Sequence, residues 1–394
     1  MICALGIAQI TAWGTTYYCL GVLAASIIAE TGWSRTLVFS GFTAGLLAIG
    51  LVSPWAGRFI DQYGARTVMT IGTVLASLCL YALSLVRSEA EYLAVWAFLG
   101  VGMRLVLYDA AFAALVQVAP SRGRLAISYL TLFGAFASTV FWVIGHYLNE
   151  ALGWRQTLVA FAVIQLLVCL PLNWFGLSWR ESAGQAATPA EKARAAREGP
   201  PLTGRLRTLT LVLFAMVMSL NGFIFGVMSV HLVPLLEAAG LTAASAVWIA
   251  SLKGFAQFGG RVVEITFGRN LRAITVARIA LGVLPLSFLV LLAAGGKLYA
   301  ILLFTLLMGA AQGVITIVRG AVPLALFGAE GYGAVLGMLA TPFVIVNATA
   351  PAIFALVVDR WGWPAGEWTL LGTCATSWIA MELMARWYAR ARRA

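Results

Sequence analysis

Long apolar runs alternate with short polar breaks along almost the whole chain. A helix that spans a membrane needs about 20 consecutive residues, most of them apolar. The pattern therefore predicts twelve membrane-spanning helices joined by short loops. Their expected ranges are 3–29, 36–57, 67–87, 92–117, 125–148, 155–178, 208–236, 243–265, 273–295, 298–324, 334–358 and 366–387.

A long hydrophilic stretch in the middle of the chain divides these helices into two sets. It covers residues 179–207 and mixes alanine, glycine, proline and glutamate with basic side chains. Those basic residues are Arg180, Lys192, Arg194, Arg197, Arg205 and Arg207. We therefore predict an all-α integral membrane protein with a six-helix bundle at 1–178, a cytoplasmic linker at 179–207 and a second six-helix bundle at 208–394, which ends in a short basic tail.

Composition supports a membrane location. Of the 394 residues, 61% are hydrophobic and 10% are charged, whereas about 25% are charged in a soluble domain. Because so few polar groups cannot cover an exterior in water, the exterior is expected to face lipid. The net charge of +11 would suggest nucleic acid in a soluble protein, but here it lies in alternate loops, so no nucleic acid is expected. The cysteines form no CxxC pair, and we expect no disulfide, metal or cofactor.

The distribution of basic residues predicts the orientation, since cytoplasmic loops carry the excess of arginine and lysine. One set of loops and tails contains Arg58, Arg66, Arg122, Arg124, the linker residues, Arg261, Arg269, Arg272, Arg386, Arg390, Arg392 and Arg393. The other set contains Arg35, Arg87, Arg155, Lys297 and Arg360. We therefore place both termini in the cytoplasm of a cell with a bacterial-type inner membrane. The apolar start lacks the basic region of a signal peptide and is read as the first span, with or without a short cytosolic segment before it.

The loop after the second predicted helix carries a specific motif. It reads Gly57-Arg58-Phe-Ile-Asp61-Gln-Tyr-Gly64-Ala-Arg66. Glycine permits close helix approach and unusual turn conformations, and Asp61 can cap a helix or pair with an arginine. The motif resembles the GxxxDxxGxR signature of the major facilitator superfamily. The resemblance implies two six-helix bundles, alternating access to a central site, and a role for this loop as a conformational latch.

A weaker copy of the motif follows the eighth helix. Gly260-Arg261-x-x-Glu264 lies about 200 residues after the first copy, with glutamate in place of aspartate. Parallel repeats of this kind relate the two halves of such carriers. We therefore predict a second part of the latch at Gly260, Arg261 and Glu264.

Shorter segments resemble particular branches of the superfamily. The bacterial monocarboxylate and oxalate/formate branch is matched by Gly32-Trp33-Ser34-Arg35, Gly153-Trp154-Arg155 and Gly254-Phe-Ala-Gln257-x-x-x-Arg261, in which Gln257 stands at the place of the branch's aspartate. Arg261 then corresponds to a substrate-binding arginine, so its role stays open between substrate and latch. Two other segments resemble arsenical-efflux carriers. They are Tyr108-Asp109-Ala-Ala-Phe112 and Phe133-Gly-Ala-Phe-Ala-Ser138-Thr-Val-Phe-Trp142.

Ionisable side chains inside the predicted spans are candidates for function, because charge in hydrocarbon is costly. Arg104 lies about 13 residues from the outer start of its helix, or ~20 Å along the axis, at the depth where such transporters bind substrate. Lys253 and Arg319 are further interior cations, against one clear anion, Asp109. An anionic substrate would balance this excess. The alternative is that these cations form structural pairs or reach the interface.

Asp109 follows Arg104 by five residues, which on a continuous helix is about 140° around the axis. The two are therefore not expected to pair closely. Aligning the halves through Gly123 and Gly333 places Asp109 opposite Arg319 instead. We predict a salt bridge between them that forms in one transport state and breaks in another.

Three kinds of neutral or titratable side chain complete the predicted site. Tyr17, Tyr18 and Asn221 are expected as pocket walls, although aromatic side chains at this spacing more often pack than bind. His231 is a candidate for proton coupling, because histidine titrates near neutral pH. The alternative is an interfacial histidine held by a hydrogen bond.

Together these features predict a secondary active transporter for a small organic anion such as a monocarboxylate, proton-coupled or working by exchange. Its partners are the lipid bilayer, the small anion and protons, and the chain is expected as a monomer. No GxxxxGK[ST] loop is present in the sequence, so ATP is not expected as the energy source. The open alternatives are an efflux carrier for a neutral, metalloid or drug-like solute and, in another class, a polytopic membrane enzyme or receptor. Without a cluster of His, Asp and Glu, no enzyme activity is predicted.

Overall fold

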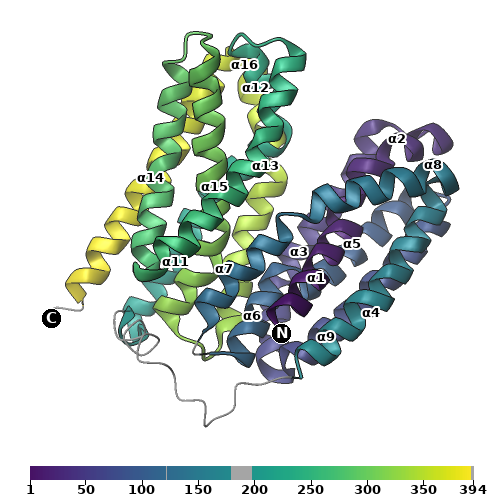
Figure 1. Ribbon diagram of the computed structural model, residues 1–394, viewed down its shortest axis with the longest axis horizontal. Coiled ribbons are helices and arrows are strands. Elements are labelled where there is room, and N and C mark those ends of the chain that lie inside the picture. Colours follow the sequence, from purple (N-terminus) through teal and green to yellow (C-terminus); the bar gives the residue numbers. More distant parts are fainter. Residues whose placement is uncertain (121, 179–197, 392–394) are drawn as a thin grey trace. The chain divides into compact units, whose positions relative to one another are not determined.

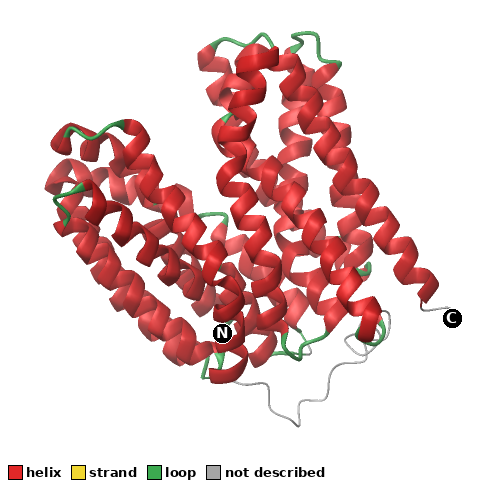
Figure 2. Cartoon of the chain, turned by 180° about the vertical axis from the view of Figure 1, so that it is seen from behind, coloured by secondary structure: helices red, strands yellow, loops and turns green. Residues whose placement is uncertain are grey.

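The computed structural model describes residues 1–120, 122–178 and 198–391. Within these ranges the regular structure is helical, with no strand (Figure 2). The chain forms two compact units. Unit 1 comprises Met1–Glu191 with Ala329–Thr341, and unit 2 comprises Lys192–Gly328 with Pro342–Ala394. Most of the linker predicted at 179–207 lies outside the described residues.

Unit 1 contains the first half of the helices, coloured purple to teal in Figure 1. They are α1 (Ile2–Ala12), η1 (Trp13–Tyr17), α2 (Cys19–Thr31), α3 (Arg35–Tyr63), α4 (Ala65–Leu85), α5 (Glu89–Val106), α6 (Tyr108–Val118), α7 (Gly123–Gly134), α8 (Ala137–Ile164), η2 (Gln165–Cys169) and α9 (Leu170–Gly176). Unit 2 contains α11 (Gly204–Val230), α12 (Leu232–Ala238), α13 (Ala243–Thr266), η3 (Gly268–Asn270), α14 (Ala273–Leu292) and α15 (Leu298–Phe327). The last helix, α16 (Tyr332–Ala391), begins in unit 1 and continues in unit 2.

The long helices confirm the predicted twelve spans. By length and composition, nine helices of the described chain could each cross a membrane, but Gly123–Gly176 and Tyr332–Arg390 are 54 and 59 residues long. Each of these two contains a glycine with non-helical backbone, Gly153 (φ 79°, ψ 165°) and Gly362 (φ 79°, ψ 173°). Dividing both at these glycines and adding the 24-residue α13 gives twelve.

Glycines allow corresponding helix pairs to pack closely in both units. In unit 1, a side chain on Gly100 of α5 would collide with the backbone oxygen of Gly45 on α3. In unit 2, a side chain on Gly313 of α15 would collide with the backbone of Gln257 on α13. Backbones can come this near only where no Cβ intervenes. The same kind of close helix seam therefore occurs in both units.

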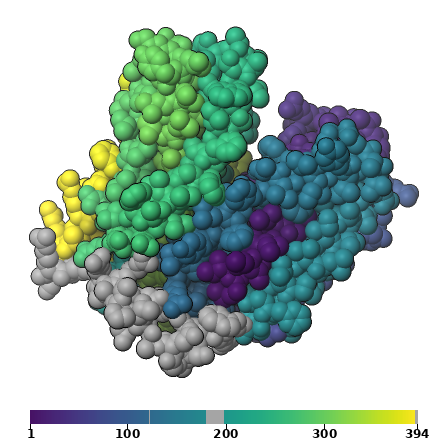
Figure 3. All heavy atoms as spheres, in the orientation of Figure 1, coloured from purple at the N-terminus to yellow at the C-terminus, as the bar shows by residue number. Residues whose placement is uncertain are grey.

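Helix α1 lies between helices that follow much later in the sequence. It packs against α7 on one side and against α9 and η2 on the other. Figure 3 shows its purple atoms between the blue and teal atoms of unit 1. This central position brings α1 into contact with the irregular parts of its neighbours.

Candidate functional site

The fourth membrane span is broken in its middle. Helix α5 ends at Val106, α6 starts at Tyr108, and Leu107 between them is extended, with φ −79° and ψ −170°. Arg104 therefore lies in the last turn of α5 and Asp109 in the first turn of α6. Each charge is favourable at its helix end, because the C-terminus of a helix attracts cations and the N-terminus attracts anions. The predicted 140° offset between them assumed a continuous helix, and the break at Leu107 removes that assumption.

Arg104 is almost completely enclosed, with 2% of its surface exposed. Its Nε donates a hydrogen bond of 2.7 Å to the hydroxyl of Ser53 on α3. Arg104 lies 15 residues after Glu89, the start of α5, or ~22 Å along the helix. This is about half of the 30-residue apolar segment Glu89–Val118.

A side chain from α1 stabilises the break. The Nε2 of Gln9 donates a 2.7 Å hydrogen bond to the backbone oxygen of Val106, and Gln9 itself is buried. Its Oε1 accepts a 3.2 Å hydrogen bond from the indole of Trp13. In a membrane interior each backbone group released by a helix break needs such a partner. Gln9 was not identified as a site residue from the sequence.

The first span is also irregular, at the residues that contact the break in the fourth span. Residues Trp13–Tyr17 form a π-helical turn, η1. The hydroxyls of Thr15 and Thr16 donate to the backbone oxygens four residues earlier, at 2.8 and 2.6 Å. π-Turns inside α-helices occur frequently at functional sites.

Aromatic rings join the two irregular spans. The ring of Trp13 lies 4.9 Å from Tyr17, 6.1 Å from Tyr18 and 5.0 Å from Tyr108, the first residue of α6. Tyr17 also meets Phe42 of α3 edge-on, at 4.9 Å. Trp13, Tyr17 and Tyr18 are half-buried. The predicted pocket residues Tyr17 and Tyr18 thus belong to one aromatic cluster beside the break that carries Arg104.

The other two predicted cations lie in unit 2, both half-buried. The Nζ of Lys253 on α13 donates to the backbone oxygen of Met228 at 3.3 Å and lies 5.6 Å from the ring centre of Phe225. The guanidinium of Arg319 on α15 lies 4.4 Å from the ring centre of Phe343. Cations over aromatic faces are stabilised by the ring quadrupole. Asp109 and Arg319 belong to different units, and their pairing stays a prediction.

Two further predicted residues of unit 2 are held by hydrogen bonds. The Nδ2 of Asn221 donates to the hydroxyl of Ser377 at 2.7 Å and to the backbone oxygen of Val217 at 2.8 Å. The Nε2 of His231 lies 3.0 Å from the backbone oxygen of Pro351, between α11 and α12. This contact corresponds to the structural alternative considered for His231.

Gln312 on α15 was not identified from the sequence. It is 5% exposed, and among the described residues neither its Oε1 nor its Nε2 has a hydrogen-bond partner. It precedes Arg319 by seven residues, about two helical turns, so the two share a face. A buried amide without a protein partner requires an explanation, and a bound polar solute would provide one.

The loop motif Gly57–Arg66 caps the start of α16. The carboxylate of Asp61 accepts hydrogen bonds from the backbone N–H groups of Gly333 at 2.9 Å and Ala334 at 2.7 Å. Both are first-turn residues of α16, and all three belong to unit 1. This contact requires glycine at position 57, because a side chain there would collide with the backbone of Gly333. Of the two roles considered for Asp61 from the sequence, the structure shows a helix cap.

Other residues brace the same loop. The side chain of Gln117 on α6 accepts from the N–H of Ala65 at 2.8 Å and donates to the backbone oxygen of Ile60 at 2.9 Å. Gly64 has φ +82°, a conformation that favours glycine. Arg66 lies 3.9 Å from the ring centre of Trp174, whereas Arg58 is exposed. Gln117 was not identified from the sequence.

The second copy of the motif lies inside unit 2. Gly260 packs against the backbone of Ala310, and both Arg261 and Glu264 are buried. The Nε of Arg261 donates to the backbone oxygen of Gly313 at 3.4 Å. Arg261 thus contacts the α13–α15 seam, in contrast to the exposed Arg58 of the first copy.

Comparison with known proteins agrees with this architecture. Residues 5–304 match the Major Facilitator Superfamily. No curated protein matches the sequence significantly. Among solved structures, the human organic anion transporter MFSD10 (TETRAN) is similar with a TM-score of 0.75 and 17% identity, over 96% of this chain and 98% of that one.

Two further solved structures share the fold. The proton:xylose symporter XylE, bound to 6-bromo-6-deoxy-D-glucose, has a TM-score of 0.67 and 14% identity over 96% of this chain and 94% of that one. The transporter FucP in the outward conformation has a TM-score of 0.69 and 16% identity over 97% and 98% of the respective chains. At these identities the likeness extends to the fold alone.

Proposed function

Because the chain belongs to the Major Facilitator Superfamily, we propose that it is a secondary active transporter that moves a small organic anion by alternating access. The supporting observation is Arg104, a cation with 2% exposure at a helix break in mid-span. A guanidinium at this depth can form charge-assisted hydrogen bonds with a substrate carboxylate, and ionisable side chains inside spans commonly mark the substrate path.

The surroundings of Arg104 suit a small anion with an apolar body. Ser53 holds Nε and thereby orients the guanidinium. The half-buried rings of Trp13, Tyr17 and Tyr18 lie on the adjoining irregular turn. Broken helices in mid-membrane are the usual location of substrate sites in secondary carriers. A monocarboxylate, the substrate class of the branch that the sequence resembles, has this combination of one charge and a small apolar part.

Gln312, Lys253 and Arg319 supply a second group of polar side chains. Gln312 offers an unused amide, and the two cations are half-buried. We assign these residues to the substrate path of unit 2. The human fold neighbour described as an organic anion transporter is in keeping with an anionic cargo, although its likeness carries the fold alone.

The remaining features of the proposal concern orientation and energy. The arginine-rich loops place both termini in the cytoplasm of a bacterial-type inner membrane. Transport is coupled to protons or proceeds by exchange, with Asp109 or His231 as the titrating group, in a monomeric chain. The loop Gly57–Arg66 acts as a conformational latch by capping α16 through Asp61, and Gly260, Arg261 and Glu264 form its counterpart.

Transport by the purified protein in proteoliposomes tests the proposal. A panel of lactate, oxalate, arsenite and a neutral sugar, each with and without a pH gradient, identifies the substrate class. Losing one hydrogen bond to a charged group costs about 1.5–3 kcal/mol, so Arg104→Ala is expected to lower anion uptake at least ~10-fold. The control Ser77→Ala, a buried serine that bonds only the backbone of its own helix, should leave uptake unchanged. Uptake of arsenite or sugar but of no organic anion would refute the anion assignment.

A further inference from the structure

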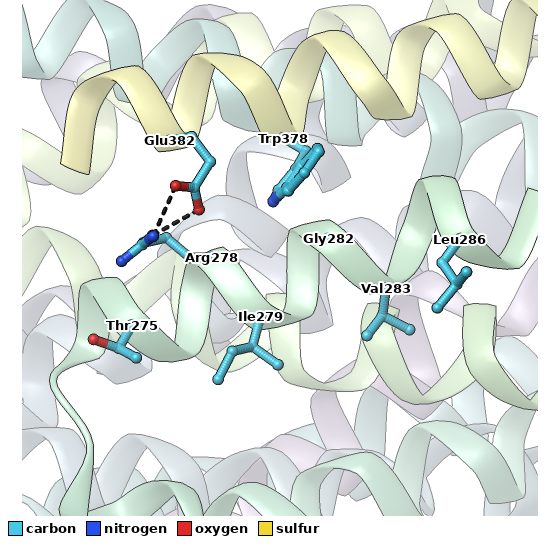
Figure 4. A pocket seen from close by; sticks show the side chains of 8 residues that line it. All are labelled: Thr275, Arg278, Ile279, Gly282, Val283, Leu286, Trp378 and Glu382. Atoms are coloured by element: carbon cyan, nitrogen blue, oxygen red, sulfur yellow. Dashed lines mark hydrogen bonds and ion pairs between the residues drawn. The ribbon is translucent and has the colours of Figure 1, made fainter. Parts of the chain in front are cut away.

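A groove of about 430 Å³ runs between α14 and the last part of α16, within unit 2 (Figure 4). Its lining extends along α14 from Thr275 to Leu286 and includes Trp378 and Glu382 of α16. None of these residues belongs to the substrate site or the latch described above. The groove therefore requires a separate explanation.

One end of the groove is charged and the other is apolar. At the charged end, Arg278 donates to both carboxylate oxygens of Glu382, from Nε at 2.6 Å and from Nη2 at 2.8 Å (Figure 4). Val283 and Leu286 line the apolar end. Ile279 and Leu286 are both more than half exposed, so this surface is expected to face hydrocarbon in a membrane-spanning chain.

The two helices are antiparallel here, because Arg278 meets Glu382 while Gly282 meets Trp378. The start of α14 therefore lies beside the end of α16, and both are basic. Arg272 directly precedes α14, and Arg386 follows Glu382 by one turn. The carboxylate of Glu198 also lies at this end, where it accepts a 2.8 Å hydrogen bond from the N–H of Ala273. Three arginines therefore face two carboxylates, which leaves an excess of positive charge.

Arg278 has donors left for a ligand. Its guanidinium carries five N–H groups, of which the ion pair uses two, and its side chain is 43% exposed. Glu382 is 18% exposed, and each of its oxygens already accepts a hydrogen bond. The open side of the pair therefore favours an anion over a cation.

Trp378 adds a second donor within the groove. Its indole nitrogen lies over Gly282, 3.0 Å from where a Cβ would stand, and it makes no hydrogen bond to any residue that the structure describes. A tryptophan N–H usually has a partner, and tryptophan is enriched where one end of the side chain is apolar and the other is wet.

The length of the groove matches one leaflet. The 12 residues from Thr275 to Leu286 extend ~16 Å along the helix, about half of a hydrocarbon core of ~30 Å. A ligand with an anionic head and a chain of one-leaflet length has the required shape and charge. Basic pockets between membrane helices are known to bind anionic headgroups.

We propose that this groove is a binding site for an anionic phospholipid of the phosphatidylglycerol type. The phosphate accepts hydrogen bonds from the free N–H groups of Arg278, and one acyl chain lies along Gly282, Val283 and Leu286 beside Trp378. Gly282 is necessary, because a side chain there would crowd the indole of Trp378, whose nitrogen lies 3.0 Å from the Cβ position, and would push it into the groove.

Photolabelling of the full-length protein in vesicles tests this site. Phosphatidylglycerol and phosphatidylcholine with the same photoactivatable acyl chain are compared, and labelled peptides are mapped. We expect phosphatidylglycerol to label Ala273–Leu292 and the peptide around Trp378 in preference to phosphatidylcholine. Because one basic residue near anionic lipid contributes ~1 kcal/mol, Arg278→Gln should reduce this labelling about fivefold. The control Arg360→Gln removes the same charge at an exposed position of α16 far from Glu382 and should change labelling less than about twofold.

A second variant keeps the test decisive if Arg278→Gln does not fold. Gly282→Leu fills the groove without changing any charge, and labelling of its walls by phosphatidylglycerol should disappear. Equal labelling by both lipids, labels that map elsewhere, equal effects of Arg278→Gln and Arg360→Gln, or unchanged labelling of Gly282→Leu would each overturn the proposal. None of these results depends on which solute the protein transports.

Discussion

Gln9 of α1 donates a 2.7 Å hydrogen bond to the backbone oxygen of Val106, the last residue of α5. One neutral side chain thereby connects the π-turn of the first span to the break in the fourth. Without Gln9, the backbone carbonyl of Val106 would have no hydrogen bond from α1, in a region where water does not replace it. The position of Arg104, two residues before Val106, depends on this connection.

Gln9→Met should therefore destabilise the protein, since methionine keeps the volume but removes the donor. Leaving a buried acceptor unsatisfied costs about 1–3 kcal/mol. We expect a lower midpoint of thermal unfolding in detergent, measured by tryptophan fluorescence. We also expect weaker anion transport. The control is Gln156→Met, at an exposed position. An unchanged midpoint for Gln9→Met would show that the break does not need Gln9.

Asp61→Ala should loosen the first turn of α16. It removes the acceptor of the Gly333 and Ala334 N–H groups, and loss of a helix cap costs about 1 kcal/mol. Hydrogen exchange measured by mass spectrometry on the segment 329–341 should then become roughly fivefold faster, since 1.4 kcal/mol is a factor of ten.

The matched control for this exchange experiment is Gln62→Ala, the exposed neighbour, whose side chain makes no hydrogen bond within the described chain. It should leave exchange in 329–341 unchanged. Equal exchange in Asp61→Ala and the unmodified protein would contradict the capping role.

Gly313→Ala should destabilise unit 2, because the new methyl group would collide with the backbone of Gln257. Forcing an extra carbon into a packed seam costs about 1–3 kcal/mol. Gly259→Ala is the control, since nothing lies within 4 Å of its added Cβ, and replacing glycine in a helix stabilises it by roughly 0.8–1 kcal/mol. The two thermal midpoints should move in opposite directions, and a shift in the same direction would refute the seam.

Charge reversal tests the proposed pairing of Asp109 with Arg319. Each single variant, Asp109→Arg and Arg319→Asp, should abolish transport, because like charges side by side cost several kcal/mol. The double variant should recover a measurable rate in the proteoliposome assay. Arg319→Asp combined with Asp359→Arg, at an exposed position, is the mismatched control. Recovery in neither or in both combinations would exclude a specific pair.

The spans could be predicted from the sequence because each is a long apolar run, and hydrocarbon requires such runs to be helical. Arg104 and Asp61 could be identified because a buried charge and a spaced glycine motif are visible without a structure. The break at Leu107 could not, since neither glycine nor proline occupies that position. Its stability comes from Gln9, 97 residues away.

Glutamine accounts for much of what the sequence did not reveal. Gln9, Gln117 and Gln312 carry no charge, so a search for costly ions in the membrane passes over them. Gln9 and Gln117 matter because their side chains bond backbone groups of neighbouring helices. Gln312 matters because its buried side-chain amide has no partner among the described residues. Similarly, Gly362-Trp363 repeats Gly153-Trp154 with the same φ of 79°, a correspondence between the halves that is plain once the backbone is known.

The division of α16 between the units has a consequence for split-gene experiments. Unit 1 takes Ala329–Thr341 from the distal part of the chain. A coding sequence cut within 179–207 would therefore yield an N-terminal polypeptide whose Asp61 has no helix to cap. We expect such a fragment to be degraded when produced alone and to accumulate when the complementary fragment is co-expressed.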